Sequence, residues 1–234
     1  MKYYFLIIVL FVFGAVKAQI SEGVYIFQEK NENSTTIHEI KVDDAYLVYT
    51  IYAENSAQFI STMGGFYSLN NNLLEIKLEF NSNFDKDGLT STSWPIEFSE
   101  NEIHLKETKP LHFKKLPKAR QELDGKWLFA TRGPDEGQER RGEEQARKTM
   151  KFLIDGHFQW IAYQTETFKF SGTGGGTFSS KDGIYKEEIN FFSRDNNRVG
   201  TTLEFTYEVK GSDWHHKGKN SKGEPMYEIW SRRE

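Results

Sequence analysis

Two adjacent histidines, in the stretch Trp214-His215-His216-Lys217, are the residues best suited to metal or hydrogen-bond chemistry in this sequence. If this stretch is a strand, neighbouring side chains point to opposite faces, so only His216 shares a face with Trp214. A zinc site needs three or four converging ligands. His157 and His216 supply two, and no spaced histidine pair or metalloprotease motif supplies the others. We therefore expect a buried or surface histidine here, with no metal and no other cofactor.

A glycine run, Thr173-Gly174-Gly175-Gly176-Thr177, is a second candidate for chemistry, because glycine-rich loops can hold phosphate groups. Such a loop follows a strand, opens a helix and is followed by a Lys-Ser/Thr pair. Here a β-type segment follows the run instead. We therefore expect a glycine-rich bend or bulge in a curved barrel strand.

The segment from Arg194 to Arg198, Arg-Asp-Asn-Asn-Arg, has two interpretations. The two arginines would bind a carboxylate or a sugar at a barrel rim, or the segment is a polar turn, which we favour. The sequence shows no Gly-x-Ser-x-Gly motif, no carboxylate pair in a catalytic context and no Ser/His/Asp set. Enzymatic activity is therefore left undecided, with a non-enzymatic protein favoured.

Alternating side chains predict the strands that must position these residues. Residues 203–209 alternate apolar and polar side chains, which is the period of a strand with one solvent-exposed face. Turn signals follow one another at short intervals: Asp155-Gly156, Lys181-Asp182-Gly183 and Gly211-Ser212-Asp213. We therefore predict an all-β fold, built as an antiparallel up-and-down sheet or barrel.

Composition narrows the class of protein. The formal charge of −4 gives no basic excess to attract nucleic acid, so no nucleic-acid partner is expected. The absence of cysteine excludes disulfides, thiolate ligands and a lipid-modified cysteine at a mature N-terminus. The aromatic share of 15% suits pleated sheets with a bulky core.

The first 18 residues resemble a secretory signal peptide. Lys2 is followed by an apolar run over residues 5–13, and small residues at Val16 and Ala18 fit cleavage after Ala18. A membrane anchor would need about 20 apolar residues, and this run is shorter. We therefore expect a secreted or periplasmic protein that is not a lipoprotein and whose mature chain does not insert stably into a membrane.

The chain also repeats itself. Residues 22–27 resemble residues 124–129, and residues 59–68 resemble residues 170–179 in the same order along the chain. The apolar alternation is interrupted near Pro117 and its charged neighbours. We therefore predict a duplication, with one domain over residues 19–117, the more degenerate copy, and another over residues 118–234.

The second half carries extra sequence over residues 133–148. This segment is densely charged and lacks an apolar stripe with which to dock. A surface insertion is the favoured interpretation. The alternative is a lid at a barrel mouth, since long structured loops often carry function.

The stretch Leu123-Asp124-Gly125-Lys126-Trp127 resembles the Gly-x-Trp opening of lipocalins, in the calycin superfamily. The resemblance implies that Trp127 packs at the closed end of a barrel beneath Arg232 or Arg233, with Tyr25 and Lys115 in these places in the first half. The usual lipocalin disulfide and the motif between the later strands are missing, so the resemblance is to a lipocalin-like domain. The second half also resembles secreted bacterial proteins of unassigned function, which implies no chemistry.

Taken together, these patterns predict two tandem lipocalin-like antiparallel barrels, or strongly curved sheets. The predicted function is non-catalytic binding of a small, partly apolar or aromatic ligand in the C-terminal barrel. The candidate ligand-binding residues are aromatic or polar side chains of the second half: His157, Trp160, Tyr163, Arg194, Arg198, Tyr207, Trp214, His216 and Tyr227. The alternatives are that the aromatic residues fill the core, or that the protein is a structural or interaction module that binds protein or polysaccharide at the cell envelope. The oligomeric state is not indicated.

Overall fold

The computed structural model describes residues 19–54, 58–220 and 223–233, so the predicted signal peptide lies outside the described residues. The described chain forms strands β1 to β16, one short α-helix and one 3-10 turn. The predicted all-β, antiparallel barrel class is confirmed. Within these ranges, no helix is both long and apolar enough to cross a membrane.

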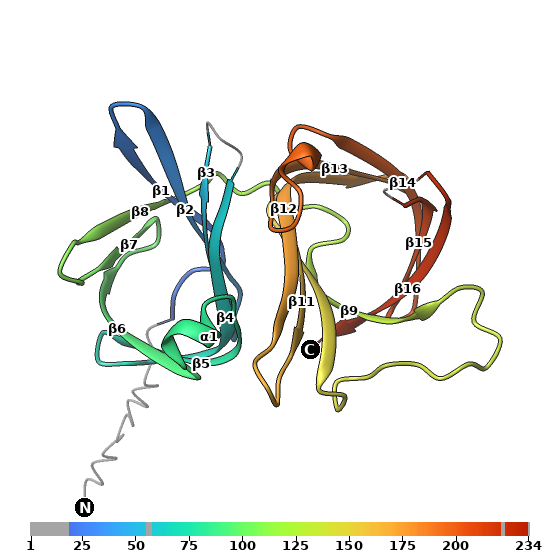
Figure 1. Ribbon diagram of the computed structural model, residues 1–234, viewed down its shortest axis with the longest axis horizontal. Coiled ribbons are helices and arrows are strands. Elements are labelled where there is room, and N and C mark those ends of the chain that lie inside the picture. Colours follow the sequence, from blue (N-terminus) through green and yellow to red (C-terminus); the bar gives the residue numbers. More distant parts are fainter. Residues whose placement is uncertain (1–18, 55–57, 221–222, 234) are drawn as a thin grey trace, which may run out of the picture.

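The first eight strands form a closed antiparallel barrel, here called the first barrel (Figure 1). Each strand pairs with the next one along the chain, and β1 pairs with β8 to close the barrel. Its elements are β1 (Gly23–Asn31), β2 (Ser34–Val42), β3 (Tyr46–Ala53), β4 (Gln58–Asn70), β5 (Leu73–Asn81), α1 (Phe84–Asp87), β6 (Ser91–Phe98), β7 (Glu102–Leu105) and β8 (Leu111–Lys115).

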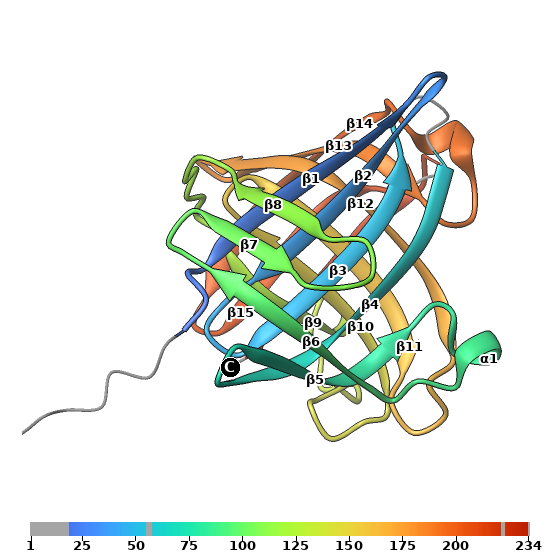
Figure 2. The same ribbon diagram turned by 90° about the vertical axis from the view of Figure 1, so that its left-hand side faces the viewer.

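The remaining eight strands close in the same way, with β9 paired to β16, and are here called the second barrel. Its elements are β9 (Gly125–Arg132), β10 (Arg147–Ile154), β11 (His157–Gln164), β12 (Phe170–Lys181), β13 (Ile184–Phe192), η1 (Asn196–Arg198), β14 (Thr202–Lys210), β15 (Asp213–Lys219) and β16 (Pro225–Arg233). Figure 2 shows the strands of the first barrel running obliquely across the view. The domain limits at residues 117 and 118 stay a prediction.

The predicted turns of the second half are confirmed. Asp155 and Gly156 have φ angles of 47° and 78°, and Asp182 and Gly183 have φ angles of 52° and 77°. Such positive angles match the twist of a tight hairpin, and Asp and Gly tolerate them better than most residues. These two turns therefore set the register of β10 with β11 and of β12 with β13.

The glycine run in β12 is a bulge, as predicted. The register of β12 with β13 shifts between Gly175 and Gly176. A Cβ atom on Gly176 would lie 2.0 Å from the carbonyl oxygen of Glu188, so only glycine fits there. In the first barrel, the register of β4 with β5 likewise shifts at Gly65, whose Cβ would lie 1.9 Å from the oxygen of Lys77. Bulges at these places bend both barrel walls.

The predicted Trp127–Arg232 contact is present at one end of the second barrel. The Arg232 guanidinium lies 4.2 Å from the centre of an indole ring of Trp127, within the range of a cation–π contact. Trp127 Nε1 donates to the carbonyl oxygen of Leu123 at 2.9 Å. Gly125 has a φ of 137°, and a Cβ there would lie 2.4 Å from Arg232 Nη1. Glycine at this position therefore makes room for the guanidinium.

The first barrel has the corresponding arrangement in a weaker form, also as predicted. Lys115 Nζ lies 5.7 Å from the centre of the Tyr25 ring. The Tyr25 hydroxyl donates to the carbonyl oxygen of Ser21 at 2.6 Å. Gly23 has a φ of 146°, and a Cβ there would lie 2.6 Å from Lys115 Cε. In both halves, the Gly-x-aromatic sequence at the start of the first strand thus places an aromatic ring next to a basic side chain of the last strand.

The two barrels pack against each other through like faces. Phe80 of the first barrel packs on Tyr163 of the second, with ring centres 5.1 Å apart. Tyr52 packs on Phe191 at 4.8 Å. Tyr163 lies 111 residues after Tyr52, and Phe191 lies 111 residues after Phe80. The same two positions of the repeat therefore meet twice, with the barrels exchanged. This is the pattern of a two-fold contact.

Polar groups inside this interface are hydrogen-bonded across it. The side chain of Gln159, which is fully buried, bonds Thr50 at 2.9 Å, Thr62 at 3.1 Å and Thr173 at 3.1 Å. At another place, Arg233 donates to both carboxylate oxygens of Glu79, each at 2.8 Å. Buried polar groups with such partners fix the relative orientation of the two barrels.

Candidate ligand site in the second barrel

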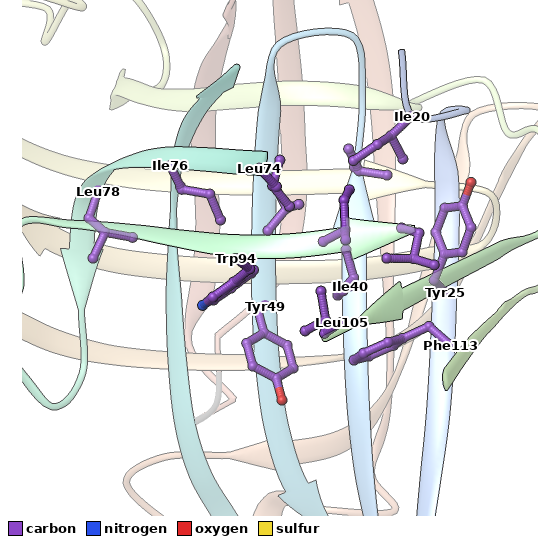
Figure 3. Close-up of a cluster of buried hydrophobic side chains, with 14 residues drawn as sticks. Ile20, Tyr25, Ile40, Tyr49, Leu74, Ile76, Leu78, Trp94, Leu105 and Phe113 are labelled. Carbon is purple, nitrogen blue, oxygen red and sulfur yellow. The ribbon is translucent and has the colours of Figure 1, made fainter. Parts of the chain in front are cut away.

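The interior of the first barrel is a packed core of apolar and aromatic side chains (Figure 3). Its fully or nearly fully buried members are Ile20, Tyr25, Ile40, Val42, Leu47, Tyr49, Leu74, Ile76, Leu78, Trp94, Ile96, Ile103, Leu105 and Phe113. These residues come from strands all around the barrel and from the segment before β1. Core packing therefore accounts for this interior.

The interior of the second barrel contains a buried ion pair. Lys151 on β10 and Glu187 on β13 join at 2.7 Å between Nζ and Oε1, and their side chains are only 7% and 6% exposed. The Tyr185 hydroxyl donates to the same carboxylate oxygen at 2.7 Å. Burial is the first cause, and Glu187 the second, of a Tyr185 pKa far above the ordinary value. Tyr185 therefore stays protonated and donates to Glu187.

Aromatic rings surround the Lys151 ammonium group. Its Nζ lies 5.0 Å from the ring centres of Tyr185 and Trp214, 5.3 Å from that of Trp230 and 5.9 Å from that of Phe205. A desolvated ammonium over aromatic faces is stabilised by about 2 kcal/mol. These contacts, with Glu187, offset part of the free energy needed to bury a charge.

His216, on β15, completes the polar cluster. It is 1% exposed, and its Nδ1 lies 3.7 Å from Glu228 Oε2, too far for a hydrogen bond. Burial, and then the positive charge of Lys151, lowers the pKa of His216 to about 4. His216 is therefore neutral at pH 7, with one ring nitrogen a donor and the other an acceptor.

The same ladder positions in the first barrel hold apolar residues. Trp127 faces Lys151 across β9 and β10, whereas Tyr25 faces Ile40 across β1 and β2. In the same way, the register of β12 with β13 matches that of β4 with β5, and the register of β15 with β16 matches that of β7 with β8. The resulting correspondences are Lys151 with Ile40, Glu187 with Ile76, His216 with Leu105 and Glu228 with Leu111. A barrel of this architecture thus closes without these polar groups.

Half-buried aromatic residues lie beyond the polar cluster, away from the Trp127–Arg232 contact. Trp160 packs on Phe192 with ring centres 5.4 Å apart, and Phe129 packs on Trp230 at 5.6 Å. The Arg141 guanidinium lies 5.1 Å from the Phe129 ring centre. Glu228, 24% exposed in its side chain, connects the buried cluster with solvent. This end of the barrel is therefore lined by aromatic side chains.

The structure brings four of the predicted site residues together. Trp160, Tyr207, Trp214 and His216 all belong to, or pack against, the interior of the second barrel. The Tyr207 hydroxyl is bonded to the Glu122 carboxylate. Their role in ligand binding stays a prediction.

Two other predicted residues lie between the barrels. His157 Nδ1 contacts Glu39 Oε2 at 3.1 Å, and Tyr163 donates to Glu79 at 3.0 Å. Burial, and then the charge of Lys41, lowers the pKa of His157 to about 4. Both side chains point away from the barrel interior, because β11 presents its other face there.

The remaining predicted residues lie on the outer wall or at the rim. Tyr227 bonds His215 at 2.8 Å on the outer face of β15 and β16. Arg194 donates through Nε to the carbonyl oxygen of Ser171 at 2.7 Å, and Arg198 lies 3.6 Å from Asp195 in the η1 turn. The segment over 194–198 is therefore a polar turn, which is the favoured of its two interpretations.

Sequence reasoning missed Lys151, Tyr185, Glu187 and Glu228. One signal was present: Lys151 interrupts the otherwise mainly apolar stretch of residues 150–154. A lysine there is unusual, because lysine is seldom fully buried without a partner. The partner on β13 lies 36 residues further along the chain, and its position follows only from barrel closure.

A metal site does not form from the two histidines considered above. His157 lies between the barrels and His216 lies inside the second one. Across residues 19–54, 58–220 and 223–233, no group of three His, Cys, Asp or Glu side chains is arranged to hold a metal ion.

The charged insertion after β9 is the long yellow-green loop that extends from the second barrel in Figure 1. Arg140 bonds Asp213 at 2.6 Å and Ser231 at 2.9 Å. Glu143 accepts from Arg233 at 2.5 Å. The insertion thus contacts the outer wall, while its Arg141 lies over Phe129 at one end of the barrel, so the two interpretations of this segment both stay open.

Comparison of the sequence with protein-family models gives no match, and comparison with curated proteins gives none either. Function is therefore inferred from the residues of the site.

Proposed function

We propose that this protein binds a small molecule inside the second barrel and does not catalyse a reaction. The observation that supports the proposal is the polar cluster of Lys151, Glu187, His216 and Glu228, set where the first barrel has isoleucine and leucine. Replacing a buried ion pair by apolar residues is often neutral or stabilising. The cluster therefore has a use other than stability.

Ligand binding is such a use. Barrels of about eight strands have interiors that hold either packed side chains or one small ligand. A binding site is typically apolar and aromatic, with a few polar groups that orient the ligand. The second barrel has this composition, with aromatic rings around the cluster and at one end of the barrel.

We further propose that the chain is exported and that its two barrels are a tandem of lipocalin-like domains. The N-terminal pattern supports cleavage after Ala18 and a secreted or periplasmic location. Two features recur in both halves, the Gly-x-aromatic opening under a basic residue and the bulge at a glycine pair. These features support a shared origin of the two barrels.

The test is native mass spectrometry of the full chain, expressed with its own N-terminus in a secreting host. We expect a reproducible added mass that is lost in a His216→Leu variant, which takes the first-barrel residue at that position. The matched control is His215→Leu, because His215 lies next in sequence but on the outer face.

A clean mass, together with no thermal shift across a panel of small molecules, would overturn the proposal. Such a result favours a module that contacts protein or polysaccharide at the cell envelope.

A further inference from the structure

Two histidines face each other on the outer wall of the first barrel. His104 on β7 is the direct cross-strand partner of His112 on β8, and their ring centres lie 4.4 Å apart. Their neighbours Ile103 and Phe113 belong to the barrel core and are 0% exposed, so both histidines point outward. His112 is exposed, and the His104 side chain is 28% exposed. Dissolved ions therefore reach both rings on the wall that faces the viewer in Figure 2.

The register of β7 with β8 brings the two rings close together. Lys115 donates its backbone N–H to the carbonyl oxygen of Asn101 at 2.8 Å, so Asn101 and Lys115 form a hydrogen-bonded pair. Hydrogen-bonded and non-hydrogen-bonded pairs alternate along an antiparallel ladder. His104 and His112 lie three positions further along each strand and therefore form a non-hydrogen-bonded pair. Side chains of such pairs approach each other most closely, so both imidazoles can reach one ion.

A carboxylate next to His104 prepares this ring for a metal ion. Glu102 Oε2 lies 3.3 Å from His104 Nε2. When the ring is neutral, its Nε2–H donates to Glu102, and Nδ1 keeps a free lone pair. Metal-binding histidines are typically oriented by such a carboxylate partner. Glu102 therefore fixes the tautomer that a metal ligand needs.

A hollow beside His104 leaves room for an ion with its water molecules. Its volume is about 200 Å³, and it is lined by Glu97, Phe98, Ser99, Glu102 and His104. Glu97 lies opposite His104 on β6, and its carboxylate also pairs with Lys106 at 2.8 Å. Two carboxylates thus line the hollow, which favours a cation over an anion.

Two imidazoles with water suit one metal ion in particular. Imidazole binds late first-row divalent ions, and among these a given site generally binds copper(II) most tightly. Copper(II) takes a square-planar or tetragonal arrangement of nitrogen and oxygen ligands. A zinc site needs three or four protein ligands, and across the described residues no group of three His, Cys, Asp or Glu side chains is arranged to hold an ion.

We infer that His104 and His112 form a copper(II) site on the outer wall of the first barrel. One ring nitrogen of each histidine is a ligand, and water occupies the other positions. The corresponding pair in the second barrel is His215 with Ile229. Ile229 is 0% exposed, and His215 bonds the Tyr227 hydroxyl. This position of the second barrel therefore offers one imidazole where the first barrel offers two.

The experiment is a titration of the metal-free full chain with copper(II), followed by calorimetry and by electron paramagnetic resonance. We expect saturable binding of one copper ion per chain. The resonance spectrum should show tetragonal copper with hyperfine splitting from two imidazole nitrogens. Zinc(II) should bind more weakly than copper(II), and manganese(II) more weakly still.

Variants provide a second measurement. In His112→Gln, copper affinity should fall at least about tenfold, the effect of about 1.4 kcal/mol, because one of the two ligands is lost. His104→Gln should cause a similar loss. The matched control is His215→Gln, which removes a histidine from the outer wall of the second barrel and should leave the affinity unchanged. The resonance spectrum of the unmodified chain needs no variant, so the inference is testable even if a variant fails to fold.

Several results would overturn the inference. Copper affinity that is unchanged in His112→Gln, or that falls equally in His215→Gln, would place the ion elsewhere. A spectrum with a single nitrogen ligand, or no binding up to about 1 mM copper(II), would exclude the paired site. None of these results bears on the ligand proposed for the second barrel, because the two sites share no residue.

Discussion

Single residues distinguish the two barrel interiors, and the Lys151–Glu187 pair is the clearest case. The pair lies at 2.7 Å with both side chains almost fully buried. A buried charge without its partner is strongly unfavourable, whereas an apolar pair of similar volume is well tolerated. The first barrel shows the apolar solution at the same positions, with Ile40 and Ile76.

The ion pair can be replaced experimentally by the isoleucine pair of the first barrel. Lys151→Ile alone should lower the free energy of unfolding by about 3–5 kcal/mol, because Glu187 is left buried without its partner. Lys151→Ile combined with Glu187→Ile should recover most of this loss. Urea unfolding at pH 7 measures both, and a double variant no more stable than the single variant would contradict the expectation.

His216 should make the protein sensitive to acid. Its pKa is about 4 when folded and 6.5 ordinarily, so the unfolded chain binds the extra proton between these values. The free energy of unfolding should therefore fall as pH drops from 6.5 to 4, by about 3 kcal/mol for this group. In His216→Leu this part of the decline should be missing. Urea unfolding at pH 7 and pH 4.5 compares the two, and equal declines would refute the assignment.

At the scale of elements, the alternation of apolar and polar residues predicts where the strands lie. It does not show which face of a strand points into the barrel. The turns at Asp155-Gly156 and Lys181-Asp182-Gly183, and the glycine bulge, follow from local backbone chemistry and are confirmed. On β10 and β11, however, both faces are largely buried, one in the barrel and one against the other barrel. The sequence therefore predicts His157 and Tyr163 in the ligand site, whereas both lie between the barrels.

The bulges of β4 and β12 should be intolerant of any side chain. Gly176→Ala places a Cβ against the backbone of β13, which cannot move without breaking the ladder. We expect a loss of about 3 kcal/mol in urea unfolding, the upper range for overpacking. Gly200→Asn is the control, because nothing lies within 4 Å of a Cβ there and Asn tolerates its φ of 79°. Equal losses in the two variants would show that glycine flexibility alone matters.

At the scale of the whole molecule, the two barrels are joined by both apolar and charged contacts. Val24, Tyr46, Val48 and Phe80 of the first barrel share one apolar cluster with β10 and β11 of the second. The ion pair of Arg233 with Glu79 links the last strand of the chain to β5. We therefore expect the protein to unfold in one cooperative transition.

Removing that link should destabilise both barrels together. Arg233→Met leaves Glu79 partly buried without its cation, and we expect a loss of about 3 kcal/mol. Lys186→Met is the control, since its pair with Glu204 is exposed and contributes at most about 1 kcal/mol. Differential scanning calorimetry measures the change. A normal melting temperature in Arg233→Met would show that the apolar cluster alone holds the barrels together.

The contact between like faces has a consequence for how the two cores can differ. In a symmetric pair of identical subunits, every substitution appears in both copies, so an unfavourable core would be present twice. Here the two copies are one chain, and Lys151 and Glu187 occur in one core while Ile40 and Ile76 occupy the other. We therefore expect the first barrel to stabilise the second one, to which it is permanently attached, so that the second barrel keeps buried polar groups that a lone barrel would tolerate less well.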